Sequence, residues 1–311
     1  MIILRSISEL ASLPGPVVLA VGTFDGLHLG HQALIRHAME EALRVNGTAV
    51  VMTFDRHPCA LVRPDHCPKL LTTQHAKIGI LKQMGVPAIL LLEFNMQLAS
   101  LSAEEFITEL AAAGHPLHMI CVGFQWSFGK GGVGNVAVLE RLGKSLEFAV
   151  SQIPPVEVGG SQVSSTRIRA AIAAGEFPDA EACLGRPFLL SGRVVRGAGL
   201  GSRIGFPTAN LGTEGMQLPP DGVYAVRVMH EGIVTAGVMN IGFRPTVDAP
   251  EPSRSVEVHL FDWSQNLVGQ ELTIEFVGYL RGEKKFPNLD ALVTQIKKDC
   301  TNARGVLSVG L

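Results

Sequence analysis

The sequence predicts a doubly wound, Rossmann-like α/β domain followed by a small antiparallel β-barrel domain with a C-terminal helix. The 311 residues of the chain exceed what a single hydrophobic core usually contains. Up to residue 185, short apolar runs alternate with helical patterns, which is typical of a parallel sheet covered by helices. From Arg186 onward, β-patterned runs alternate with turn residues. We therefore predict two domains, residues 1–185 and 186–311.

Five apolar runs are expected to form the strands of the first domain: residues 17–21, 49–54, 88–92, 119–122 and 146–150. Helical patterns lie between these runs. The clearest one begins at Ser102, whose hydroxyl can form a capping box with the carboxylate of Glu105. Right-handed crossovers between parallel strands place the ligand site beyond the carboxyl ends of the strands.

The second domain is expected to consist of strands until its last helix. The β-patterned runs are residues 189–195, 223–229, 234–239, 256–261 and 271–277, and a helical pattern follows at 289–301. Glycine, proline, asparagine and aspartate separate the runs, as in hairpins. This pattern predicts a small closed barrel with a terminal helix.

The composition limits the classes of partner. The formal net charge is −2, and 47% of the residues are hydrophobic, which excludes a disordered chain and a broad basic surface for nucleic acid. The longest apolar runs are too short to span a bilayer, and the first residues do not form an export signal. The five cysteines are scattered without a C-x-x-C pair, which favours reduced thiols over disulfides or zinc. We expect a cytoplasmic protein that binds small molecules but no nucleic acid, membrane or structural metal.

The first candidate site is the glycine-rich turn at residues 22–31, which follows the first predicted strand and precedes a helix at 32–45. Gly22, Phe24 and Asp25 belong to this turn. Glycines and a helix start together form a cradle for phosphate. His28 and His31 stand three residues apart, where both imidazoles can donate to phosphoryl oxygens. The alternative is a surface helix start with two incidental histidines.

A second motif, at residues 164–169, supports the nucleotide interpretation. Ser164, Ser165 and Thr166 can cap a helix, while Arg169 offers several donors to a triphosphate. Taken alone, this motif also fits a capped helix with solvated arginines. Together the two motifs resemble the H-x-G-H nucleotidyltransferase superfamily, and this resemblance implies transfer of AMP from ATP with release of pyrophosphate.

Two further loops follow predicted strands of the first domain, at residues 53–58 and 122–130. Both lie at strand carboxyl ends, where a doubly wound sheet binds its ligands. The second loop contains Gly123 and three aromatic residues, which could form a slot for a planar ring. Aromatic side chains folded back on the core are the alternative.

The barrel domain opens with a glycine-rich segment at residues 192–211. Its backbone N–H groups could wrap around phosphates, and Thr208 and Asn210 offer oxygen ligands suited to Mg²⁺. Ordinary turns and a hairpin cap are the alternatives. In the run at 256–261, Val256 and Val258 share one face, so Glu257 and His259 share the other. Glu257 could there accept the proton of a substrate hydroxyl, although an exposed glutamate is the alternative.

The order of these motifs resembles the family of bacterial bifunctional riboflavin kinases and FAD synthetases over nearly the whole chain. The segments that carry the resemblance are residues 22–31, 53–58, 123–129, 164–169, 205–210, 240–246, 257 with 259, and 280–286. The Gly-Phe-Pro-Thr-Ala-Asn segment at 205–210 is the most specific of them.

The resemblance implies two reactions. The barrel would phosphorylate riboflavin with ATP and Mg²⁺, giving FMN and ADP, and the first domain would adenylylate FMN to FAD and release pyrophosphate. It further implies that Glu257 is the general base, that Thr208 and Asn210 hold Mg²⁺, and that His28, His31 and Arg169 act on the ATP phosphates. Binding of nucleotide or flavin is implied for Gly22, Phe24, Asp25, Gly123, Ser164, Ser165, Thr166, Gly205, Phe206, Pro207, Asn240 and Arg281.

Several residues depart from the family pattern near these sites: Arg56, Gln125, Ser127, Ser202 and Val268. The first three favour a narrower alternative, a riboflavin kinase with a weak or silent adenylyltransferase domain. A non-catalytic flavin and nucleotide sensor, and adenylyl transfer to another phosphate-bearing acceptor, are further alternatives. The oligomeric state stays open.

Overall fold

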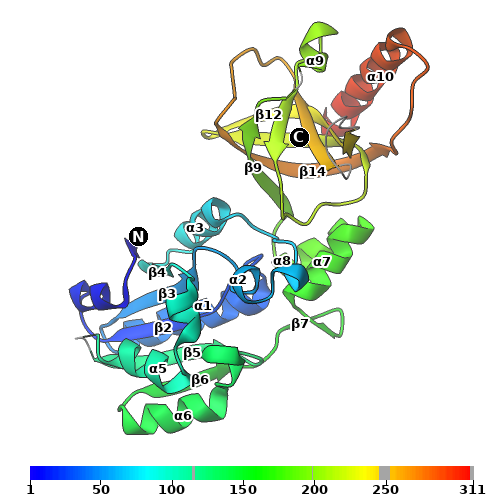
Figure 1. Cartoon of the computed structure of the whole chain (residues 1–311). Coiled ribbons are helices and arrows are strands. Elements are labelled where there is room, and N and C mark those ends of the chain that lie inside the picture. Colours follow the sequence, from blue (N-terminus) through cyan, green and yellow to red (C-terminus); the bar gives the residue numbers. More distant parts are fainter. Residues whose placement is uncertain (114–115, 198, 245–252, 309–311) are drawn as a thin grey trace. The chain divides into compact units, whose positions relative to one another are not determined.

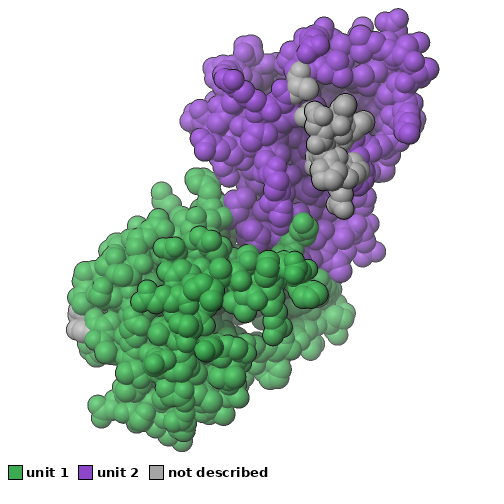
Figure 2. All heavy atoms as spheres, in the orientation of Figure 1, with its two compact units in different colours: residues 1–69, 74–168, 183–185 green, residues 70–73, 169–182, 186–311 purple. Residues whose placement is uncertain are grey.

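The computed structural model describes the whole chain except residues 114–115, 198, 245–252 and 309–311 (Figure 1). The described chain forms two compact units (Figure 2). The first contains residues 1–69, 74–168 and 183–185, and the second contains residues 70–73, 169–182 and 186–311.

The first unit is built on a six-stranded parallel sheet with the order β1-β4-β3-β2-β5-β6. The strands are β1 (Ile2–Leu4), β2 (Val17–Val21), β3 (Thr48–Phe54), β4 (Ala88–Leu92), β5 (Leu117–Gly123) and β6 (Ala149–Ile153). All five predicted strands are confirmed, but β6 starts three residues later than expected. The reason is a turn: Leu146 caps the preceding helix, and Glu147 has a φ of +60°.

Helices cover both faces of this sheet, so the doubly wound prediction is confirmed. Alternate residues of β2 face different cores: Leu19 packs with the core that α5 and α6 complete, and Val18 with the core that α1 and α3 complete. The helices are α1 (Leu29–Arg44), α2 (Cys59–Val62), α3 (Gln74–Gln83), α4 (Met96–Ser100), α5 (Ala103–Ala111) and α6 (Val136–Ser145), with 3₁₀ turns η1 (Ile7–Ser12), η2 (Pro64–His66) and η3 (Lys130–Gly132). The capping box of Ser102 and Glu105 starts α5 as predicted.

A short hairpin and two helices precede the barrel. They are β7 (Glu157–Val158), β8 (Ser161–Gln162), α7 (Ser165–Ala174) and α8 (Phe177–Leu184). Helix α7 begins in the first compact unit and continues in the second, because the division falls between Ile168 and Arg169.

The second unit contains a closed antiparallel barrel with the order β10-β13-β12-β11-β14-β9, which confirms the predicted fold class. Its strands are β9 (Leu189–Val195), β10 (Ala209–Gly212), β11 (Gly222–His230), β12 (Ile233–Arg244), β13 (Ser253–Leu260) and β14 (Glu271–Arg281). The predicted terminal helix is α10 (Leu289–Ser308), whose Ala303 and Leu307 pack against Val223 and Val238 of the barrel. Within the described residues, no helix is both long and apolar enough to cross a membrane.

Candidate active sites

A cavity of about 680 Å³ lies beyond the carboxyl ends of β2, β3 and β5 in the first unit. This is where a doubly wound sheet binds its ligands. Of the predicted site residues, six line this cavity: Gly22, Phe24, His28, His31, Gly123 and Ser164. The structure therefore brings together motifs that are up to about 140 positions apart in the chain.

His28 and His31 form a stacked pair at the start of α1. Their ring centroids are 3.6 Å apart and the rings are nearly parallel. His28 is the N-cap of α1, and its Nδ1 accepts a hydrogen bond from the backbone N–H of His31 (3.3 Å). Since a neutral imidazole that accepts at one nitrogen carries its proton on the other, the Nε2 of His28 is a donor.

The imidazole of His31 is held neutral. Desolvation lowers the pKa of His31 well below its usual value, and electrostatic interactions with His28 and Lys77 lower it further. Its Nδ1 is buried and has no hydrogen-bond partner among the described residues. A buried ring nitrogen without a partner next to a cavity fits a group that completes its hydrogen bonds with a ligand.

The loop between β2 and α1 is held in an uncommon backbone conformation. Phe24 and Leu27 have φ values of +51° and +44°, although neither is glycine, and both side chains are fully buried. The ring of Phe24 contacts His31 edge-on at 5.3 Å between centroids. Asp25 is also buried. The buried side chains of Phe24 and Asp25 therefore support the conformation of this loop.

The serine-rich motif at the start of α7 meets this loop. The hydroxyl of Ser165 donates to the backbone carbonyl of Asp25 (2.9 Å). Ser164 accepts the backbone N–H of Arg167 (3.2 Å), as a helix cap does. Arg167 donates to two carbonyls of the β7–β8 hairpin, so its guanidinium supports structure. Thr166 is exposed.

Arg169 lies half-buried on α7, one turn after Ser165, and is counted in the second compact unit. It does not line the cavity of the first unit. The sequence-based role of Arg169 in phosphate binding therefore stays a prediction.

Lys77 is a half-buried cation that sequence reasoning missed. It lies on α3, and its Nζ donates to the carbonyl of Thr23 (2.8 Å) and approaches the hydroxyl of Thr53 (3.4 Å). Burial lowers the pKa of Lys77 to about 8, although the charges of Asp25 and Asp55 oppose this shift. A lone lysine in a helical pattern carries no sequence signal for such a position.

The aromatic side chains of the loop after β5 both pack on the core and line the cavity. Trp126 and Phe128 stack with centroids 4.4 Å apart and pack on the core, and both also line the cavity. Phe124 lines the cavity with 56% of its surface exposed. Two of the residues that depart from the family pattern, Gln125 and Ser127, line it as well.

The second unit has its own cavity, of about 540 Å³. Glu257 on β13 is paired in register with Asn210 on β10 and with Asn240 on β12, so three polar side chains form a row across adjacent strands. The hydroxyl of Thr208 donates to Oε2 of Glu257 (3.2 Å). All four residues line the cavity.

The predicted alternation along β13 is confirmed. Val256 and Val258 are buried, whereas Glu257 and His259 are half-buried on the other face. His259 donates from Nδ1 to the carbonyl of Pro207 (2.8 Å), which anchors the segment before Thr208.

The glycine-rich segment between β9 and β10 contains a short helix, α9 (Leu200–Arg203), which the sequence did not predict. Gly201 and Phe206 line the cavity. Gly205 has a φ of +84°, which favours glycine. A Cβ at Gly197 would collide with the side-chain amide of Asn210. Ala198 of this segment lies outside the described residues.

Arg281 lines the second cavity but is anchored by a neighbouring carboxylate. Its guanidinium makes a bidentate pair with buried Asp299 of α10, with the shortest N–O distance 2.7 Å. Asp299 was not singled out from the sequence. Of the predicted motif at 240–246, Pro245 and Thr246 lie outside the described residues.

Two protein families match different parts of the chain. Residues 11–167 match the FAD synthetase family, and residues 184–307 match the riboflavin kinase family. Similar proteins named bifunctional riboflavin kinase/FMN adenylyltransferase include those of Escherichia coli K12 (37% identity, 97% of this chain and 96% of the relative) and Bacillus subtilis 168 (37%, 91% and 90%).

A solved structure agrees with the fold of the whole chain. It is named a macrolide-efflux protein from Streptococcus pneumoniae and matches with a TM-score of 0.79 and 32% identity, covering 98% of this chain and 99% of that one. The matches to the two sequence relatives extend over nearly the full length of each relative, and the names of both relatives state both activities. This chain therefore belongs to the family of bifunctional riboflavin kinases/FMN adenylyltransferases.

Proposed function

We propose that the barrel phosphorylates riboflavin to FMN with ATP and that the first domain adenylylates FMN to FAD. The observation that carries this proposal is that each compact unit has its own cavity, lined by the motif residues of one activity. The proposed boundary between the two catalytic domains is residue 185/186, and the proposed location is the cytoplasm.

In the barrel, Glu257 acts as the general base. Its carboxylate accepts the proton of the ribityl 5′-hydroxyl while the hydroxyl oxygen attacks the γ-phosphorus of ATP, and ADP leaves. The hydrogen bond from Thr208 orients Oε2 of Glu257. The flanking side chains of Asn210 and Asn240 supply neutral polar contacts for the substrates.

Thr208 and Asn210 fit a magnesium ion that is shared with the nucleotide. Their hydroxyl and amide oxygens are hard ligands, and Mg²⁺ commonly takes few protein ligands together with phosphates and water. The ion would neutralise charge on the phosphates. Both residues line the cavity beside Glu257, so the donor set suits a nucleotide-bound Mg²⁺ rather than an ion held by protein alone.

In the first domain, a phosphate oxygen of FMN attacks the α-phosphorus of ATP and pyrophosphate leaves. His28 donates from Nε2, and neutral His31 adds a second imidazole at the same wall of the cavity. These groups stabilise charge on phosphoryl oxygens without a covalent intermediate. Ser165, Thr166 and Arg169 of α7 are proposed to bind the same phosphates.

The narrower alternative, a kinase with a weak adenylyltransferase, is favoured by one observation. Gln125 and Ser127 line the first cavity, so these departures from the family pattern can alter binding directly. Arg56 is exposed and forms an ion pair with Asp55 (3.1 Å).

The test is a chromatographic time course of riboflavin, FMN and FAD. Purified protein is mixed with ATP, Mg²⁺ and either riboflavin or FMN. FMN that appears first and FAD that follows support both activities, whereas accumulation of FMN in the first reaction and no FAD in either one selects the narrower alternative. Glu257→Gln should lower FMN formation about 10²- to 10⁴-fold. Glu275→Gln is the matched control, because Glu275 lies on β14 and pairs with Arg227 (3.2 Å).

A further inference from the structure

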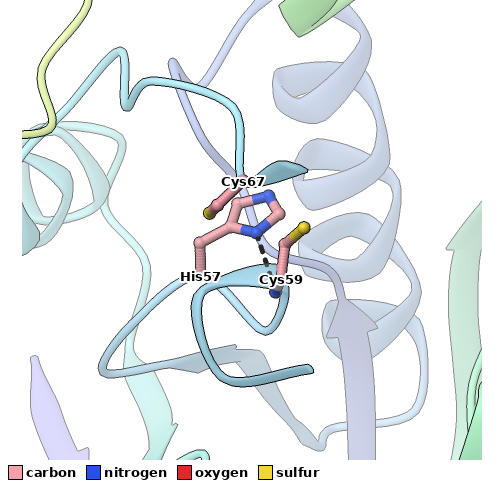
Figure 3. A group of neighbouring side chains, drawn as sticks. All are labelled: His57, Cys59 and Cys67. Atoms are coloured by element: carbon pink, nitrogen blue, oxygen red, sulfur yellow. Dashed lines mark hydrogen bonds between the residues drawn. The ribbon is translucent and has the colours of Figure 1, made fainter. Parts of the chain in front are cut away.

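One group of side chains with the chemistry of a metal site has no role in the reactions above. His57, Cys59 and Cys67 each offer one ligand atom, and these three atoms lie within 4.8 Å of one another (Figure 3). We propose that they form a binding site for a thiophilic divalent cation, with Zn²⁺ as the expected ion. This proposal does not depend on the assignments of the two active sites.

The local fold brings the three residues together by doubling the chain back. His57 follows β3, Cys59 is the first residue of α2, and Cys67 directly follows η2. The thiol of Cys59 points back toward the end of this segment, with its sulfur 3.6 Å from the carbonyl oxygen of Arg63 and 3.7 Å from that of His66. The return of the chain thus places two sulfur atoms beside one imidazole (Figure 3).

The donor set selects the class of ion. Thiolates favour Zn²⁺ over Mg²⁺ or Ca²⁺. Two thiolates and a neutral imidazole balance the charge of a divalent ion, and a water can take the fourth tetrahedral position. With Zn–S bonds of about 2.3 Å, tetrahedral sulfur atoms lie roughly 3.8 Å apart. The two sulfur atoms lie within 4.8 Å of each other and therefore need to approach by at most about 1 Å.

Binding has a defined proton balance. Each cysteine loses its thiol proton when its sulfur coordinates the ion, so two protons are released for each ion bound. The Nδ1 of His57 now accepts a hydrogen bond from the backbone N–H of Cys59 (3.2 Å). Nδ1 therefore holds a lone pair, and an ion that binds there replaces this N–H.

The accessibility of the two thiols supports their assignment. Cys59 and Cys67 are half-buried, whereas Cys121 and Cys183 are fully buried. Burial also raises the pKa of Cys121 to about 12, which disfavours the thiolate that coordinates metals. Among these four cysteines, only the pair beside His57 combines access with a nitrogen ligand.

The site lies at the rim of the first cavity. Pro58, Cys59, Val62 and Arg63 of the same segment line that cavity, so a bound ion would fasten the two ends of this rim to each other. The scattered cysteines of the sequence favour no structural metal, so this site was not predicted. The spacing His-x-Cys-x₇-Cys brings the three side chains together only because the chain turns back through α2 and η2.

The test uses the reduced, metal-stripped full-length protein and Co²⁺ as a spectroscopic probe. Tetrahedral Co²⁺ with thiolate ligands gives intense ligand-field bands and a sulfur-to-metal charge-transfer band. The wild type should bind about one equivalent with both signals, and added Zn²⁺ should remove them. A pH indicator should report about two protons released per Zn²⁺ bound.

The variants Cys59→Ser and Cys67→Ser should lose the charge-transfer band, while Cys300→Ser, whose half-buried thiol lies on α10, should keep it. Circular dichroism of each variant checks that it is folded. Since loss of even an outer-sphere partner typically weakens metal binding about 10- to 100-fold, His57→Gln should weaken it at least that much. Absence of the band in folded wild type, or a band that survives both cysteine variants, overturns the proposal.

Discussion

His28 caps helix α1 with the same imidazole that the H-x-G-H motif assigns to phosphate. The two roles use different nitrogens. Nδ1 accepts the N–H of His31, so a hydrogen bond to a phosphate must come from Nε2. The cap thereby holds the ring in the tautomer that donates toward the ligand.

The two roles of His28 are separable by substitution. His28→Asn keeps a good N-cap but removes the Nε2 donor, so FAD formation from FMN should fall about 10²- to 10³-fold with little change in stability. His28→Ala should lose the same activity and about 1 kcal/mol of stability as well. Steady-state rates and thermal unfolding of both variants measure this. Equal stability losses in both would contradict the capping role.

Lys77 makes the stability of the first unit depend on pH. Its pKa is about 8 in the folded protein and about 10.4 in an unfolded chain. Between these values the unfolded state holds more protons, so stability rises with pH. From pH 7.5 to 10, wild type should gain about 2 kcal/mol relative to Lys77→Met.

Urea unfolding at pH 7.5 and 10 measures this gain. In a Trp263→Phe background, fluorescence comes from Trp126 in the first unit, since the chain has two tryptophans. Lys82→Met is the matched control, because Lys82 lies on the same helix and is exposed. An unchanged difference between wild type and Lys77→Met at the two pH values would contradict the lowered pKa of Lys77.

At the scale of elements, the bounds of β2 and β4 were predicted to the residue, whereas β10 was not predicted. Strands β2 and β4 are five-residue apolar runs buried on both faces, so burial alone determines their extent. Strand β10 has the sequence Ala-Asn-Leu-Gly, whose intrinsic strand preference is low. Only its pairing with β9 and β13 makes it a strand.

The same distinction applies to the sites. Glu257 is identifiable because alternation along β13 and its motif agree. Its contact with Thr208 and its alignment with two asparagines depend on the register of three strands. Lys77 is unpredictable for a related reason: α3 carries its side chain to the carbonyl of Thr23, which is 54 positions away.

The capping box of α5 gives a prediction for an element. Ser102 accepts the N–H of Glu105 (3.1 Å), and Glu105 accepts the N–H of Ser102 (2.8 Å). Ser102→Ala should lower the free energy of unfolding by about 1 kcal/mol. The control is Ser161→Ala, at an exposed serine on β8. Chemical denaturation of both variants measures their free energies of unfolding. If both variants lose the same amount relative to wild type, the cap contributes no more than an exposed serine.

At the scale of the whole molecule, the separation of two cavities into two compact units predicts complementation. Glu257→Gln should make very little FAD from riboflavin but should convert added FMN, and His28→Asn should accumulate FMN and make very little FAD. A mixture of the two variants should make FAD from riboflavin, because FMN released by one protein can enter the other. Chromatography of the mixture against each variant alone tests this. Failure of the mixture would mean that FMN does not leave the protein.

The chain changes compact unit five times along its sequence, because residues 70–73 and 169–182 group with the barrel and 183–185 with the first unit. Helix α7 is divided by one of these changes. A cut at the proposed domain boundary, between residues 185 and 186, would therefore leave residues 70–73 and 169–182 on the first half, although they group with the barrel. A barrel expressed from residue 186 onward would lack these two segments, so it should be less stable than the barrel within the whole chain.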